Sequence, residues 1–167
     1  MADRGYLMAK FQFKGVDELV SQYEKLANDS QKIMGEAIYY GADVVMKHIR
    51  SAVQGIATDN HFGTAENPCI GPSTYAKEGL IQSLGITPAR YDGSFYNVKI
   101  GFDGYNGIKT KTWPSGQPNS MIARSVESGT SWMQKQPFMR QAEQSARGPC
   151  EKVMAEVVDK AIEKIVK

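Results

Sequence analysis

Long stretches of helical hydrophobic period constrain the fold of this chain more than any other feature. Apolar residues recur at three- and four-residue spacing over 16–27, over 31–53 and over 150–165. That spacing places them on one face of an amphipathic helix. Asn28, Asp29 and Ser30 interrupt the pattern and offer a helix cap. We therefore predict separate helices at 16–27 and 31–53, with Gly41 allowing another element to approach the second closely.

The segments between these helices have strand and loop patterns. Residues 10–14 alternate Phe11 and Phe13 with polar neighbours, and residues 80–102 contain further alternating stretches around a turn at Asp92-Gly93. Alternation predicts half-buried strands, and Asp-Gly is a strong hairpin signal. Glycine and proline mark two long loops at about 54–75 and 103–119. Because loops of this length are usually functional or mobile, we expect the first to contact a neighbouring subunit.

The C-terminal third is predicted to be helical again. Ser120 caps a short helix that Gly129 ends, and Pro137 begins a longer helix. Gly148-Pro149 is expected to kink or break that longer helix, because proline lacks the hydrogen-bond donor. The order of elements predicts an α+β fold in which a mainly antiparallel sheet packs against long amphipathic helices. We expect one domain over residues 1–167.

Composition excludes several classes of protein. The chain is 41% hydrophobic and 23% charged, with a formal net charge of +2, which is typical of a globular protein rather than a disordered one. That charge is small for a protein that grips nucleic acid by its phosphates. The sequence shows no signal-peptide pattern and no apolar run long enough to cross a membrane. Cys69 and Cys150 are read as two free thiols of a reducing cytoplasm, or as a single late bridge.

No catalytic, cofactor-binding or metal-ligating constellation stands out in the sequence. His48 lies on an apolar helix face, which favours a core or interface histidine, and His61 lies in a loop. Neither shows metal-ligand spacing with the cysteines. Cys69 has no evident histidine base, and the glycines at 101, 104 and 107 read as turns rather than as a phosphate cradle. We therefore expect a protein that is not an enzyme.

One small group of basic and aromatic residues is a candidate contact surface. It consists of Lys109, Lys111, Trp113 and Arg124. These residues fit either a solvated loop with one anchoring tryptophan or a contact with DNA or an acidic neighbour. The sequence leaves both interpretations open.

Two motifs near the C-terminus carry a family resemblance. They are Val126-Glu127-Ser128-Gly129-Thr130 and Pro137-Phe138-Met139-Arg140-Gln141-Ala142. The chain resembles the head–tail joining, or tail completion, proteins of long-tailed phages, the gene-ten-product family of Hong Kong-type lambdoid phages. Gln141 stands where that family usually has proline. Weaker agreement extends over Phe11 to Leu19, Ala37 to Val45 and Gly79 to Leu84, where Glu78 replaces a threonine.

The resemblance implies a structural neck protein of the virion, assembled in the cytoplasm of a bacterial host. It implies a ring, a hexamer by the symmetry of phage tails, around the channel through which double-stranded DNA passes without specific binding. Expected partners are head-stopper, tail-terminator or tail-tube proteins, and no membrane. Alternatives are a prophage-encoded DNA-binding or accessory protein and a virion-associated enzyme.

The resemblance also gives the motif residues structural roles. Gly129 is expected to provide a left-handed exit from the short helix, and Phe138 to anchor the next helix in the core. Glu127 and Arg140 are expected to pair across the turn as a clamp. Pro137 is expected at the start of the helix and Thr130 in the turn.

Overall fold

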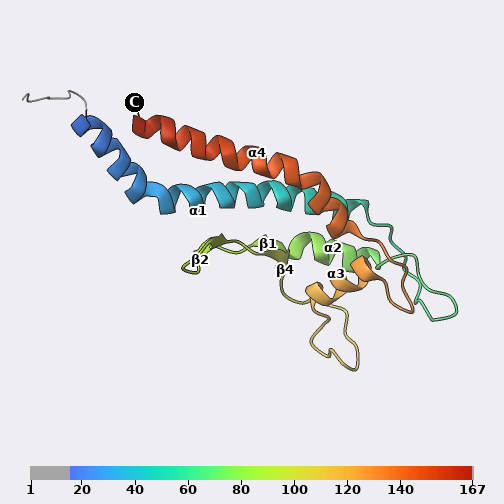
Figure 1. Cartoon of the computed structure of the whole chain (residues 1–167). Helices are drawn as coiled ribbons and strands as arrows, with labels where there is room; N and C mark the ends of the chain where they lie inside the picture. Colours follow the sequence, from blue (N-terminus) through green and yellow to red (C-terminus); the bar gives the residue numbers. More distant parts are fainter. Residues whose placement is uncertain (1–15, 167) are drawn as a thin grey trace, which may run out of the picture.

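The computed structural model describes residues 16–166, and the strand predicted at 10–14 lies outside them. Four helices account for most of this part of the chain, together with two short antiparallel ladders. The predicted α+β class is confirmed. Figure 1 shows two long helices side by side, with the smaller elements gathered below one part of them.

Helix α1 runs from Val16 to Gly55 without interruption, so the predicted break at residues 28–30 is wrong. The helical period continues in phase across these polar residues, and the Ser30 hydroxyl donates to the Ala27 carbonyl oxygen at 2.8 Å. Such back-bonding satisfies a polar side chain inside a helix and bends the helix. Figure 1 shows α1 changing direction in its N-terminal part.

Helix α4, Phe138–Val166, likewise continues through Pro149, so the predicted break is also wrong. Packing against α1 on both sides of the proline holds the helix together: Ala142 and Ala146 are buried before it. After it, Cys150 and Met154 lie against Gly41 of α1. A β-carbon on Gly41 would stand 2.7 Å from the Met154 Cγ, which confirms the predicted close approach.

The two long helices form an antiparallel arm. The Gln22 Nε2 donates to the Val166 carbonyl oxygen at 3.1 Å, so the start of α1 lies beside the end of α4. Burial in this arm is shallow: α4 has no buried residue after Ala146, although its apolar residues form one face of an amphipathic helix, as predicted. That face is only half-covered because, among the described elements, α1 alone packs along it.

The remaining elements make a small body under the arm. Helix α2 spans Thr74–Ser83 and was missed by the sequence reading, which placed a loop and strands there. Strands β1, Leu84–Ile86, and β4, Ile100–Phe102, pair antiparallel, as do β2, Arg90–Tyr91, and β3, Tyr96–Asn97, around the predicted hairpin turn. Helix α3 covers Asn119–Ser128.

The main core lies where α1, α2, α3 and the start of α4 meet. Its most deeply buried large side chains are Leu80, Val53 and Val126. Phe138 and Ile122 belong to the same cluster. Two loops leave this body: residues 56–73 project at the end of α1, and residues 103–118 project from the lower side of the molecule in Figure 1.

Candidate functional site

The motif residues meet at a junction between the end of α3 and the start of α4. The Glu127 carboxylate accepts hydrogen bonds from the backbone amides of Met139 at 2.7 Å and Arg140 at 3.2 Å. These amides belong to the first turn of α4, where N–H groups have no partner within the helix. A carboxylate also interacts favourably with the positive end of the helix dipole. Glu127 therefore caps α4 from the preceding helix.

The predicted ion pair between Glu127 and Arg140 is wrong in its chemistry. Glu127 engages the backbone amide of Arg140, and the ion pairs of the described residues do not include the Arg140 guanidinium. The side chain of Arg140 is exposed. The clamp across the turn exists, but it joins a carboxylate to a helix N-terminus.

The turn between the motifs begins at Gly129, whose φ is +73°. Its ψ of 168° lies outside the left-handed helical region, so the predicted left-handed exit is wrong although the positive φ is confirmed. This conformation of Gly129 accompanies a long-range hydrogen bond at the end of α3. There the Val126 carbonyl oxygen accepts from the amide of Gln136 at 2.8 Å. Thr130 then forms a tight turn in which its amide donates to the Met133 carbonyl oxygen at 2.9 Å.

Phe138 anchors the junction in the core. Its side chain is only 3% exposed and meets the Phe102 ring edge-on, with the ring centroids 6.0 Å apart. The predicted role of Phe138 as a core anchor is confirmed. Pro137 directly precedes the helix, and its carbonyl oxygen accepts from the Gln141 amide at 3.3 Å. Proline suits this position because its fixed φ already matches a helix start.

Gln136, which the sequence reading did not single out, ties the 56–73 loop to the junction. Its side-chain amide exchanges two hydrogen bonds with the backbone of Ala57, at 2.8 and 3.0 Å, and donates to the Ile70 carbonyl oxygen at 2.9 Å. The backbones of Cys69 and Trp132 are joined nearby at 3.0 Å. An isolated glutamine gives no sequence signal for such a long-range contact.

The basic and aromatic candidates lie apart from this junction. Lys109 and Lys111 are exposed on the 103–118 loop, and Trp113 is half-buried in the same turn. The base of that loop is held by buried Asn106, whose side-chain oxygen accepts from the amides of Ile108 and Gln117. Arg124 is exposed on α3. No hydrogen bond between described residues joins Arg124 to the three loop residues.

Thiol and imidazole groups do not converge. Cys69 is buried with its Sγ 3.2 Å from the Trp132 carbonyl oxygen, and both cysteines are free. Burial raises the pKa of the Cys150 thiol, and the nearby Glu151 carboxylate raises it further. The His48 Nδ1 lies 2.9 Å from the Ser145 hydroxyl, which places this histidine at the α1–α4 interface. Within residues 16–166, no cluster of three potential metal ligands is found.

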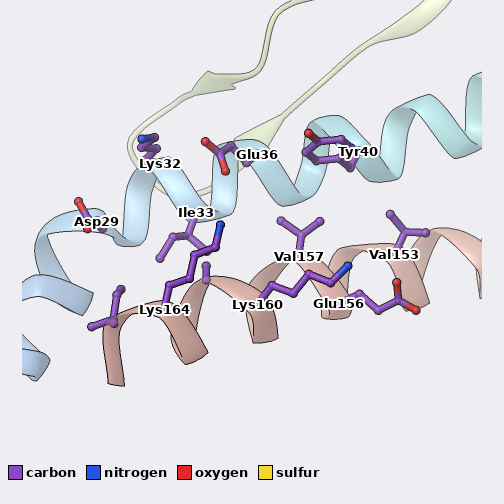
Figure 2. A pocket seen from close by; sticks show the side chains of 12 residues that line it. Asp29, Lys32, Ile33, Glu36, Tyr40, Val153, Glu156, Val157, Lys160 and Lys164 are labelled. Atoms are coloured by element: carbon purple, nitrogen blue, oxygen red, sulfur yellow. The ribbon is translucent and has the colours of Figure 1, made fainter. Parts of the chain in front are cut away.

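A groove runs between α1 and α4 on the arm (Figure 2). Its volume is about 640 Å³, and Ile33, Val153 and Val157 supply apolar side chains between the helices. Lys160 and Lys164 extend from α4 towards α1, as Figure 2 shows. The described ion pairs do not include either lysine. Asp29, Glu36 and Glu156 line the same groove as Lys32, Lys160 and Lys164, so charges of both signs border its apolar floor.

Comparison of the chain with models of known protein families, with curated proteins and with solved structures finds no match. No helix within the described residues has the length and apolar character needed to span a membrane.

Proposed function

We propose that this protein is a structural subunit of a tailed phage or prophage particle, which joins or completes the tail at the head–tail connector. In that role it forms a ring, with a hexamer as the expected form, around the DNA channel. The observation that carries the proposal is the motif pair at residues 126–130 and 137–142. The two motifs resemble those of phage neck proteins and come together in one junction.

The chemistry of that junction supports a structural role. Glu127 caps a helix, Phe138 fills the core and Gly129 makes the turn. These three motif residues thereby serve the folding of the junction. Such a junction fixes the direction of α4 relative to the body, which is what a subunit that presents a long arm needs.

The shape of the protein also supports assembly with neighbours. The arm formed by α1 and α4 extends beyond the smaller elements and leaves a long surface open to solvent (Figure 1). Part of this surface is apolar and belongs to the arm, where Leu19, Val20 and Tyr23 are all about half-exposed or more. Surface of this kind marks sites of protein–protein contact.

The exposed basic residues suit a position beside DNA. In a ring, Lys109, Lys111 and Arg124 would face the channel or an acidic neighbour, with Trp113 anchoring the loop. Contacts as few as these attract DNA weakly and in a salt-dependent way, which lets DNA pass. A DNA-binding accessory protein would instead hold duplex DNA at physiological salt, and a filter-binding titration against salt separates the two roles.

The proposal is tested on particles induced from the cell that carries the gene. Immunogold electron microscopy should place the protein at the neck of purified virions. Deletion of the gene should leave filled heads and separate tails, and a plasmid copy should restore infectious particles. Absence of the protein from purified particles would contradict the proposal.

The same complementation assay tests the enzyme alternative. Cys69→Ala, His48→Gln and His61→Gln, introduced singly, should each leave infectious yield nearly unchanged, provided that the variant folds. Val157→Asp, on the face of α4 that lines the groove, should reduce head–tail joining, because an unpaired carboxylate replaces an apolar contact. A normally folded cysteine or histidine variant that gives no infectious particles would favour an active site.

A further inference from the structure

A hollow apart from the α1–α4 groove opens on the small body, where α2 meets the base of the 103–118 loop and the start of α3. Its volume is about 320 Å³, which lies at the lower end of the range of ligand sites, roughly 300–1,000 Å³. Helix α2 contributes Tyr75 and Glu78, the loop contributes Asp103 and Tyr105, and α3 contributes its first residue, Asn119. We name this hollow the polar pocket.

Two buried side-chain amides at the polar pocket are only half-satisfied. Asn106 and Asn119 both line it and are 8% and 4% exposed. The Asn106 Oδ1 accepts from two backbone amides, and the Asn119 Nδ2 donates to the Asp103 carbonyl oxygen at 2.9 Å. The Asn106 Nδ2 and the Asn119 Oδ1 have no hydrogen-bond partner among the described residues. One donor and one acceptor are thus left over, although buried polar groups are nearly always paired.

Gly79, in the middle of α2, leaves space beside both asparagines. A β-carbon there would lie 3.4 Å from the Asn119 Oδ1 and 3.6 Å from the Asn106 Cβ, and no described atom outside its own stretch of α2 would be closer. These are ordinary contact distances, and Gly79 itself lines the pocket. An atom of a bound molecule can therefore take the place of the missing methyl group, next to the free acceptor.

The remaining lining favours an uncharged molecule that carries hydroxyl groups. Glu78 and Asp103 supply carboxylates, and none of the described residues that line the pocket is a lysine or arginine, which disfavours an anion. A metal ion or a guanidinium would suit the carboxylates but offers no acceptor to the Asn106 Nδ2, whereas a hydroxyl both donates and accepts. The exposed rings of Tyr75 and Tyr105 add aromatic surface against which the C–H face of a sugar can pack.

We infer that the polar pocket binds one ring of a neutral carbohydrate. Neighbouring hydroxyl groups of the sugar accept from the Asn106 Nδ2 and donate to the Asn119 Oδ1, and the carboxylates accept from other hydroxyls. Binding gives both buried groups the partner that they lack in the free protein, which favours the complex. The site has no part in joining subunits, so it stands or falls independently of the proposed function.

A nuclear magnetic resonance titration with neutral methyl glycosides tests the inference. The probes are the methyl glycosides of glucose, galactose, mannose and N-acetylglucosamine, with arginine methyl ester as a cationic control and glucose 6-phosphate as an anionic one. At least one neutral glycoside should shift the side-chain amide signals of Asn106 and Asn119 saturably, and more strongly than either control. No shift with any neutral glycoside, or equal binding of the arginine ester, would overturn the inference.

Gly79→Ala tests the place of binding, because its methyl group fills the space beside the free acceptor. The variant should keep or raise Tm, since alanine favours a helix, and should weaken glycoside binding about tenfold or more through the lost hydrogen bond. Gly148→Ala is the matched control, because nothing lies within 4 Å of a β-carbon there. Equal affinities of the two variants would refute the assignment of the site.

A tyrosine pair provides a test that does not depend on the helix interior. Tyr105 on the pocket and Tyr23 on α1 are each 64% exposed. Tyr105→Ala should weaken glycoside binding, whereas Tyr23→Ala should leave it unchanged. Binding that is insensitive to Tyr105→Ala would place the sugar elsewhere and contradict the inference.

Discussion

Replacing Glu127 by alanine should destabilise the protein by removing the cap of α4. The carboxylate accepts two backbone hydrogen bonds, at 2.7 and 3.2 Å. Hydrogen bonds to charged groups contribute roughly 1.5–3 kcal/mol each, but solvent reaches a half-buried site, so we expect about 2–3 kcal/mol for both together. For a chain of this size that loss lowers Tm by roughly 5–10 °C.

A double-mutant cycle with Arg140→Ala separates the cap from an ion pair. The Arg140 side chain is exposed and its backbone amide survives the substitution, so Arg140→Ala should change stability by less than about 0.5 kcal/mol. Glu127→Ala should then cost the same in both backgrounds, measured by urea denaturation. A coupling above about 1 kcal/mol would show that the guanidinium takes part, and would refute the capping argument.

Four further outcomes are expected. Phe138→Ala should cost about 3–5 kcal/mol of unfolding free energy in urea, because a buried ring leaves a cavity; a loss under 1 kcal/mol would contradict its place in the core. Gly129→Ala should lower Tm, because a side chain is strained at positive φ and its β-carbon would lie about 3.0 Å from Lys135. The pKa of Asp59 is lowered from 3.8 in the folded protein, so the charged carboxylate stabilises the fold fully above pH 3.8, and this stabilisation is lost as the pH falls through the folded-state pKa. The difference in Tm between wild type and Asp59→Asn should therefore shrink on acidification. A difference in Tm that stays constant would contradict this. The raised pKa of Cys150 should make alkylation of the native protein slow at pH 7 and faster at pH 9, measured by mass spectrometry, and fast reaction at pH 7 would argue against it.

Periodicity predicted which segments are helical better than it predicted where the helices end. The breaks expected at Asn28 to Ser30 and at Pro149 rest on local preferences of a few residues. Packing of α1 against α4, close at Gly41, overrides those preferences in the fold. Helix α2 was missed because its short sequence mixes polar and apolar residues without a clear face, while its cap, Ser73, is one serine among many polar residues.

The candidate site shows the same limit. The motifs predicted a junction with Phe138 in the core, and the structure has it. They did not predict that Glu127 bonds to amides, because backbone donors carry no signature in the sequence. The role of Gln136 depends on contacts with Ala57 and Ile70, which lie more than sixty positions away in the chain. The groove was missed for a similar reason, since it arises from the fit of two helices.

The continuity of α1 has a mechanical consequence. One unbroken helix of 40 residues connects the 56–73 loop to the part of the arm that forms the groove. Such a helix acts as a rigid strut, so the distance between the loop and the groove is set by its length rather than by a flexible linker. From Ile33 to Gly55 that distance is about 33 Å at 1.5 Å per residue. Inserting or deleting whole turns in both α1 and α4 should therefore change the distance stepwise, by about 5.4 Å for each turn.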